Sequence, residues 1–262
     1  MRPLSELSRE ALEGIVGIVF DVDDTLTTHG LLHAEALDAL WRLHRGGLRL
    51  AAVTGRPLGW ADAMAMTWPI DVAVGENGAG WCWRRHGALA HGFFDDEATR
   101  ARQRALLREV ERAVREAMPE VRVASDQPGR RCDLAFDVGE AERLDGSTVA
   151  RLTAIIEASG ARALVSSVHA HVIAGGWDKA RGTARALEEV LGEPPDPRRW
   201  IFVGDSGNDA AAFAWFEITV GVANVREHLA RLPVPPRYVT ERERGAGFAE
   251  LARRVLEARA HG

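Results

Sequence analysis

Lysine is almost absent from this chain of 262 residues, because Lys179 is the one lysine among 33 Lys and Arg residues. Most surface positions accept either cation, so a general drift toward arginine needs no functional explanation. A site that requires a compact ammonium group would nevertheless keep its lysine. Lys179 is therefore a candidate functional residue before any motif is considered.

Cysteine and asparagine are also scarce. The two cysteines, Cys82 and Cys132, lack CxxC spacing, which excludes a disulfide framework and gives no support to a structural zinc site. This pattern fits a reducing compartment, and we expect a cytoplasmic protein. Asparagine occurs only at Asn77, Asn208 and Asn224, each in a glycine-flanked or strand-end turn.

Long apolar runs and long basic blocks are missing as well. The apolar run at residues 15–20 is too short to span a bilayer, and Asp21 ends it before any signal-peptide pattern can form. The net charge of -5, with both signs interspersed, argues against nucleic acid or a membrane surface as the main partner. With 46% hydrophobic residues, the chain is long enough for one large globular domain or two modest ones.

Four short apolar segments each end in a polar turn. They cover residues 15–20, 48–53, 70–74 and 200–203, and the turns that follow contain DVDDT, TGRP, GENG and GDSGND. A helix is predicted over 34–45, closed by two glycines, and another over 246–260. Strands that alternate with helices predict a doubly wound, Rossmann-like parallel sheet, whose ligands bind beyond the carboxyl ends of its strands.

The middle of the chain has a different pattern. It predicts a charged helix over 95–117, strands over 121–124, 131–138, 162–166 and 168–173, and a helix over 140–159. In 131–138, Cys132, Leu134, Phe136 and Val138 alternate with Arg131, Asp133, Ala135 and Asp137, which predicts one packed and one solvent-exposed face. We therefore expect an α/β core at 1–91 and 175–262, interrupted by an α+β cap domain at 92–174.

Acidic residues crowd two of the strand ends. Asp21, Asp23 and Asp24 follow the first strand, and Asp205 and Asp209 follow the last. Carboxylates held this close repel each other and need a counter-charge, which a hard divalent cation such as Mg²⁺ supplies through oxygen ligands. Acidic turns that cap helices are the simpler alternative, but they do not explain two clusters after two core strands.

Together, DVDDT at 21–25, Thr54 in TGR, Lys179 and GDSGND at 204–209 resemble the four motifs of the haloacid dehalogenase superfamily of phosphohydrolases, in that family's order. The resemblance spans residues 14–92 and 177–223. The insert between Thr54 and Lys179 is similar to the C2B cap of the sugar-phosphatase branch, subfamily IIB. The resemblance implies a Mg²⁺-dependent phosphatase acting on a small phosphorylated metabolite such as a sugar or polyol phosphate.

The resemblance also implies roles for individual residues. Asp21 would be the nucleophile and Asp23 the general acid and base, while Thr54 and Lys179 would complete the catalytic set. Lys179 would neutralise charge on Asp21 and on the transferring phosphoryl group. The implied metal-binding residues are Asp21, Asp23, Asp205, Asn208 and Asp209, with the last two either orienting Asp205 or binding metal-bound water.

Asp24 departs from the family pattern, which commonly has glycine at this position. The loop there is expected to need an unusual backbone angle, and aspartate tolerates such angles better than most residues. Added negative potential at the metal site is the alternative role for Asp24.

Substrate-binding residues are predicted around the phosphate site and on the cap. They are Gly55, Arg56, Asn77, Arg131, Asp133, His169 and His171, with Ser167 and Glu76 nearby. The two histidines share a strand face at a spacing that could bind zinc, but no third ligand is evident. Trp177 is predicted either to stack on a sugar ring or to pack at the hinge between the domains.

Three other functions compete with the phosphatase. A phosphomutase is favoured by the GGWDK stretch, which is similar to one in phosphomannomutases. A response-regulator-like receiver domain also combines an acidic pocket, a threonine and a lysine, but is about half this length and leaves the cap and GDSGND unexplained. A non-catalytic sugar-phosphate sensor is disfavoured because every residue that the chemistry needs is present.

Overall fold

The computed structural model describes residues 1–141, 143–166 and 168–259. Its main feature is a nine-stranded sheet. In spatial order the strands are β1 (Arg2–Pro3), β12 (Tyr238–Val239), β11 (Ile218–Gly221), β10 (Trp200–Gly204), β2 (Gly17–Asp21), β3 (Arg49–Val53), β4 (Val72–Gly75), β5 (Gly80–Arg85) and β6 (Ala88–Phe93).

The predicted parallel core is confirmed. Strands β10, β2, β3 and β4 correspond to the four apolar segments and pair in parallel, with Val203 opposite Phe20 and Asp21 opposite Val53. Chain order reverses between β10 and β2, which makes their carboxyl ends the expected ligand site of a doubly wound sheet. The antiparallel hairpin β5–β6 at one end of the sheet and the strands β11, β12 and β1 at the other end were not predicted from the sequence.

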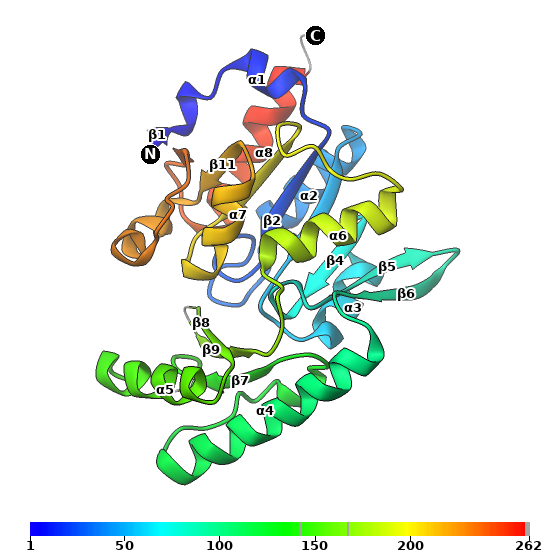
Figure 1. Cartoon of the computed structure of the whole chain (residues 1–262). Helices are drawn as coiled ribbons and strands as arrows, with labels where there is room; N and C mark the ends of the chain where they lie inside the picture. The colour runs from blue at the N-terminus through cyan, green and yellow to red at the C-terminus, as the bar shows by residue number, and fades with distance from the viewer. Residues whose placement is uncertain (142, 167, 260–262) are drawn as a thin grey trace.

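Helices cover both faces of this sheet, as Figure 1 shows. Each face of the sheet packs against its own layer of helices. Successive residues of β2 point to opposite faces, so Ile18 and Phe20 belong to one buried cluster and Val19 to the other. The first layer contains α1 (Arg9–Glu13), α2 (Ala34–Arg45), α3 (Leu58–Thr67) and α8 (Arg244–Arg259), and the second contains α6 (Lys179–Leu191) and α7 (Ala210–Trp215).

A second, three-stranded antiparallel sheet lies in the middle of the chain. Its order is β7 (Leu134–Asp137), β9 (His169–Ile173) and β8 (Arg162–Val165). In Figure 1 the helices α4 (Glu97–Ala117) and α5 (Gly146–Ala158) lie on the side of this sheet that faces away from the core. Side chains of β7, β9, α4 and α5 form a separate apolar cluster, so the insert has its own small core. We call this insert the cap.

Three cap elements differ from the sequence prediction. Residues 121–124 form no strand, since only Val123 makes an isolated bridge, to Phe136. The strand expected from residue 131 begins at Leu134, because the backbone N–H groups of 131–133 donate hydrogen bonds to the carboxylate of Glu76 in the core. The helix expected from 140 begins at Gly146, since Asp137 accepts hydrogen bonds from the amides of 139–141.

The cap face expected to meet solvent is instead buried. Asp133, Ala135, His169 and His171 are each at most 3% exposed. The reason is that this face of the cap sheet contacts the strand-end loops of the core.

Among the described helices, none is both long and apolar enough to cross a membrane.

Candidate active site

Lys179 lies fully buried between two carboxylates at the ends of different core strands. Its Nζ donates hydrogen bonds to Asp21 Oδ1, at the end of β2, and to Asp209 Oδ1 at 2.6 Å, beyond the end of β10. Asp178 caps the N-terminus of α6 by accepting from the Arg181 amide, which fixes the turn that carries Lys179. Burial alone would lower the pKa of Lys179, but Asp209 and Asp21 outweigh it and raise that pKa. The lysine is therefore a fixed cation.

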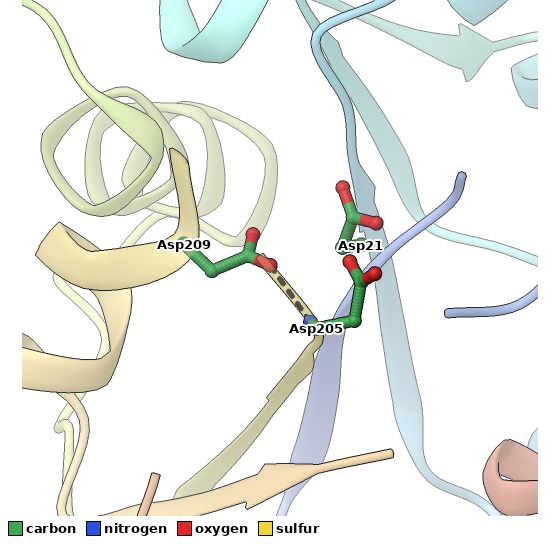
Figure 2. A group of neighbouring side chains, drawn as sticks. All are labelled: Asp21, Asp205 and Asp209. Atoms are coloured by element: carbon green, nitrogen blue, oxygen red, sulfur yellow. Dashed lines mark hydrogen bonds between the residues drawn. The ribbon is translucent and has the colours of Figure 1, made fainter. Parts of the chain in front are cut away.

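Asp205 completes a cluster of three buried carboxylates. Asp21, Asp205 and Asp209 each offer an oxygen atom within 4.8 Å of the others. Figure 2 shows the carboxylates of Asp21 and Asp205 side by side, with Asp209 bonded to the backbone amide of Asp205. Asp205 also accepts from Asn224 Nδ2 at 3.0 Å and Thr25 Oγ1 at 3.4 Å.

The charges of this cluster fit a hard divalent cation. Burial, aided by Asp209 and Asp23 and opposed by Lys179, raises the pKa of Asp21 to about 7. Burial and the neighbouring Asp21 also raise the pKa of Asp205 well above its usual value. Lys179 supplies one positive charge against three carboxylates, so a bound cation would relieve the remaining repulsion. Aspartate oxygens are the ligands that Mg²⁺ prefers.

Asp23 is not part of this cluster and instead bonds two residues that follow β3. Arg56 Nε donates to its two oxygens at 3.0 and 3.2 Å, and Thr54 Oγ1 donates to Oδ2 at 3.4 Å. The same guanidinium reaches the cap, where Nη1 donates to Glu140 at 2.8 Å. Arg56 therefore links the loop after β2 to the cap.

Asp24 has the backbone angle expected of a glycine substitute. Its φ is +55°, in the left-handed region, and its carboxylate accepts from the His29 amide and from Arg244 Nε at 3.2 Å. The prediction of an unusual angle at this position is confirmed. Its side chain closes the turn and pairs with the start of α8.

Glu76 and Asn77 follow β4 and are fully buried. Glu76 accepts hydrogen bonds from the amides of Leu58 and Arg131 through Oε1, and from Cys132 and Asp133 through Oε2, at 2.6–3.1 Å. Three of these four donors belong to the cap. Burial, aided by Asp133 and opposed by the amide bonds, raises the pKa of Glu76 to about 7. Glu76 therefore fixes the position of residues 131–133, which lead into β7 of the cap.

We expect Glu76→Ala to lower the free energy of unfolding by about 3 kcal/mol or more, because it leaves four buried backbone donors without an acceptor. Urea unfolding followed by circular dichroism measures the change. Glu116→Ala, at an exposed position of α4, is the control. Equal stability of the two variants would contradict a structural role for Glu76.

The predicted substrate-binding residues of the cap do not all lie together. Asp133, His169 and His171 face the core, and both histidines line a small cavity with Asp21, Asp23, Gly55 and Arg56. Arg131 instead turns away and pairs with Asp62 at 2.7 Å. Ser167 lies outside the described residues. Trp177 is buried in the core cluster, as expected of hinge packing.

Four side chains around the site were not assigned a role from the sequence. Thr25 and Asn224 hold Asp205, Glu140 pairs with Arg56, and Arg130 connects the cap to the core. The scarcity of asparagine was a usable signal for Asn224. Nothing in the local sequence distinguishes Arg130 from the other arginines of this arginine-rich chain.

No family model matches the chain, whereas many solved structures do. A protein of Thermoplasma acidophilum is 20% identical, with a TM-score of 0.71 over 93% of this chain and 99% of that one. The sucrose-phosphatase of Synechocystis, solved with sucrose and phosphate, is 16% identical, with a TM-score of 0.65 over 92% and 97%. A haloacid dehalogenase-like hydrolase of Bacteroides thetaiotaomicron is 15% identical, with a TM-score of 0.61 over 92% and 99%.

These likenesses cover nearly the full length of each chain, so they include the cap as well as the parallel sheet. At these identities they establish the architecture. The chain has the fold of the haloacid dehalogenase-like hydrolases, with the inserted cap that its sequence motifs predicted.

Proposed function

We propose that this protein is a Mg²⁺-dependent phosphatase that hydrolyses a small sugar or polyol phosphate through an aspartyl-phosphate intermediate. The observation that carries the proposal is the buried group of Asp21, Asp205 and Asp209 around the single lysine, beside Asp23. Three of the four sequence motifs supply these residues, which lie together at the carboxyl ends of the parallel strands.

The chemistry divides between two aspartates. One oxygen of Asp21 bonds Lys179, which leaves the other oxygen to attack phosphorus. As the bond from Asp21 to phosphorus forms, the bond from phosphorus to the ester oxygen breaks, and Asp23 donates its proton to the departing alcohol. Asp23 then accepts a proton from water, which attacks the phosphorus of the aspartyl phosphate and releases inorganic phosphate and free Asp21.

Charge on the transferring group is balanced by fixed donors. Lys179, Thr54 and the Gly55 amide are the proposed partners of the phosphoryl oxygens. Bound Mg²⁺ supplies further neutralisation of that charge. Asp21 and Asp205 would hold the ion directly. Asp209 has one oxygen bonded to Lys179 and the other to the amides of residues 205 and 206, so we assign it an orienting role.

Asp23 and Asn208 remain predicted metal-binding residues with other contacts in the structure. Asp23 pairs with Arg56, and Asn208 Nδ2 donates to Asn77 Oδ1 at 3.1 Å. We propose that Asp23 leaves Arg56 when substrate binds. The Arg56–Glu140 contact would then hold the cap closed over the reaction.

The space between cap and core can accommodate a sugar or polyol phosphate. A cavity of about 1390 Å³ lies between cap and core, and its lining includes Asp23, Arg56, Glu140 and Asp205. This cleft has room for a whole sugar or polyol phosphate beside the reaction centre. The similarity to a phosphatase solved with sucrose and phosphate favours a sugar phosphate over other esters. The cap boundaries at 92 and 174, a cytoplasmic location and the absence of nucleic-acid partners stay predictions.

Phosphate release by the purified protein tests the proposal. The panel contains sugar phosphates, polyol phosphates, nucleotides and p-nitrophenyl phosphate, each with Mg²⁺ and with EDTA. We expect release that EDTA abolishes and that Mg²⁺ restores, with a sugar or polyol phosphate as the best substrate. Release unaffected by EDTA would contradict the metal role, and no release from any ester would contradict the phosphatase.

A further inference from the structure

Two buried polar side chains, one from the cap and one from the core, meet beside Gly55. We propose that His171 Nε2 and Asn77 Nδ2 form a subsite for a hydroxyl group on the carbon next to the phosphorylated carbon of the substrate. This inference rests on the proposed phosphatase function and deepens it, since it specifies a chemical feature that the substrate must have.

Both nitrogen atoms lie beside the Gly55 backbone. A Cβ atom placed on Gly55 would lie 3.0 Å from His171 Nε2 and 3.3 Å from Asn77 Nδ2. Both side chains are at most 1% exposed. His171 also lines the small cavity that contains Asp21 and Asp23. The subsite therefore adjoins the proposed reaction centre, next to the backbone proposed to hold phosphate.

Asp133 sets the hydrogen-bonding character of His171. Its carboxylate accepts a hydrogen bond from His171 Nδ1 at 2.9 Å and is itself held by Arg130 Nη1 at 3.0 Å. Burial would raise the pKa of Asp133, but Arg130 and His171 lower it to about 2, so this carboxylate is ionised. Burial lowers the pKa of His171. A neutral imidazole whose Nδ1 carries the proton presents an acceptor at Nε2.

Asn77 supplies the complementary donor. Its Oδ1 accepts from Asn208, whereas Nδ2 is buried without a hydrogen-bond partner among the described residues. A buried unpaired donor is costly, and such groups in native structures commonly await a ligand or water. Arg130 Nη1 also donates to the Gly55 carbonyl at 2.8 Å, which holds the cap histidine against this loop.

A hydroxyl group satisfies both nitrogen atoms at once. It accepts from Asn77 and donates to His171, whereas a carboxylate would have no proton for the imidazole and a methylene group would leave both atoms unpaired. Because the proposed phosphate site is the adjoining Thr54–Gly55 segment, the hydroxyl must be close to the ester carbon. The subsite thus favours polyol and sugar phosphates over esters such as 2-phosphoglycolate.

The test compares glycerol 3-phosphate with the monophosphate of propane-1,3-diol, which lacks only the neighbouring hydroxyl. We expect the wild-type protein to prefer glycerol 3-phosphate by about 10-fold or more in kcat/KM, because loss of the hydroxyl leaves two buried polar atoms unpaired. His171→Asn retains an amide partner for Asp133 but cannot reach Gly55, so only Asn77 would still bind the hydroxyl and the preference should fall several-fold below that of the wild type. His171→Gln, whose amide reaches the Nε2 position, should restore part of it.

His91→Asn is the matched control, because His91 pairs with Asp62 at 2.7 Å and does not line this cavity. This variant should prefer glycerol 3-phosphate as strongly as the wild type does. Turnover of p-nitrophenyl phosphate by the wild type tests the phosphatase function separately. The subsite alone would be overturned if the wild type hydrolysed p-nitrophenyl phosphate but did not distinguish glycerol 3-phosphate from the propane-1,3-diol ester. An undiminished preference in folded His171→Asn would overturn it as well. No turnover of any ester would overturn both proposals.

Discussion

Asp21→Asn should reduce phosphate release by about 10⁴-fold or more, the scale of losses seen when an enzyme loses its covalent nucleophile. The amide has nearly the same shape as the carboxylate but is a far weaker nucleophile, and it gives up one charge at the metal site. Its oxygen can still accept from Lys179, so the thermal unfolding curve should show a folded protein. Steady-state kinetics with the best ester of the panel measure the loss.

Asp71→Asn is the matched control for this substitution. Asp71 lies just before β4, at the opposite end of the sheet from the site, where it pairs with Arg49 at 2.8 Å. We expect this variant to keep wild-type turnover. If Asp21→Asn kept more than about a tenth of the wild-type rate, water would be attacking phosphorus directly and the nucleophile assignment would be wrong.

Lys179→Arg should lower kcat by about 10²-fold or more, although it conserves the charge. The ammonium is fully buried between Asp21 and Asp209, and the planar guanidinium is too large to occupy that position without displacing one of them. Overpacking should also lower the free energy of unfolding by about 1–3 kcal/mol. Kinetics and urea unfolding of the same preparation separate the two effects.

Arg181→Lys on the same helix is the control, because the Arg181 side chain is exposed, bonds the Gly176 carbonyl and lies over the Phe94 ring at 5.5 Å, with neither contact involving Asp21 or Asp209. It should leave kcat near the wild-type value. Near-normal kcat in Lys179→Arg would remove the reason for expecting a compact ammonium group at this position.

The strand-end motifs were predictable because they depend on local sequence and on one general property of parallel sheets. An apolar β-branched segment followed by DVDDT predicts both the strand and its acidic end, and β10 with GDSGND repeats the pattern. Since the carboxyl ends of neighbouring parallel strands meet, the proximity of Asp21 and Asp205 followed from their positions.

The cap was less predictable because its contacts join residues far apart in the chain. Asp133 and His171 alternate as an exposed face would, yet they are buried by the core loops that they contact. Glu76 takes the amides of 131–133 and thereby shortens β7, which no periodicity within the cap reveals. The pairing of Arg56 with Glu140 likewise joins segments separated by 84 residues.

Trapping of the aspartyl phosphate shows whether Asp21 becomes covalently bound to phosphorus during turnover. The protein is mixed with Mg²⁺ and a sugar phosphate that it hydrolyses and that carries a radioactive label on phosphorus. The mixture is quenched in acid during turnover and digested for peptide mapping. We expect label on the peptide that contains Asp21, and no label in Asp21→Asn. Label on a different residue, or rapid turnover with no labelled peptide and inversion of configuration at phosphorus, would contradict the assignment of Asp21 as the nucleophile.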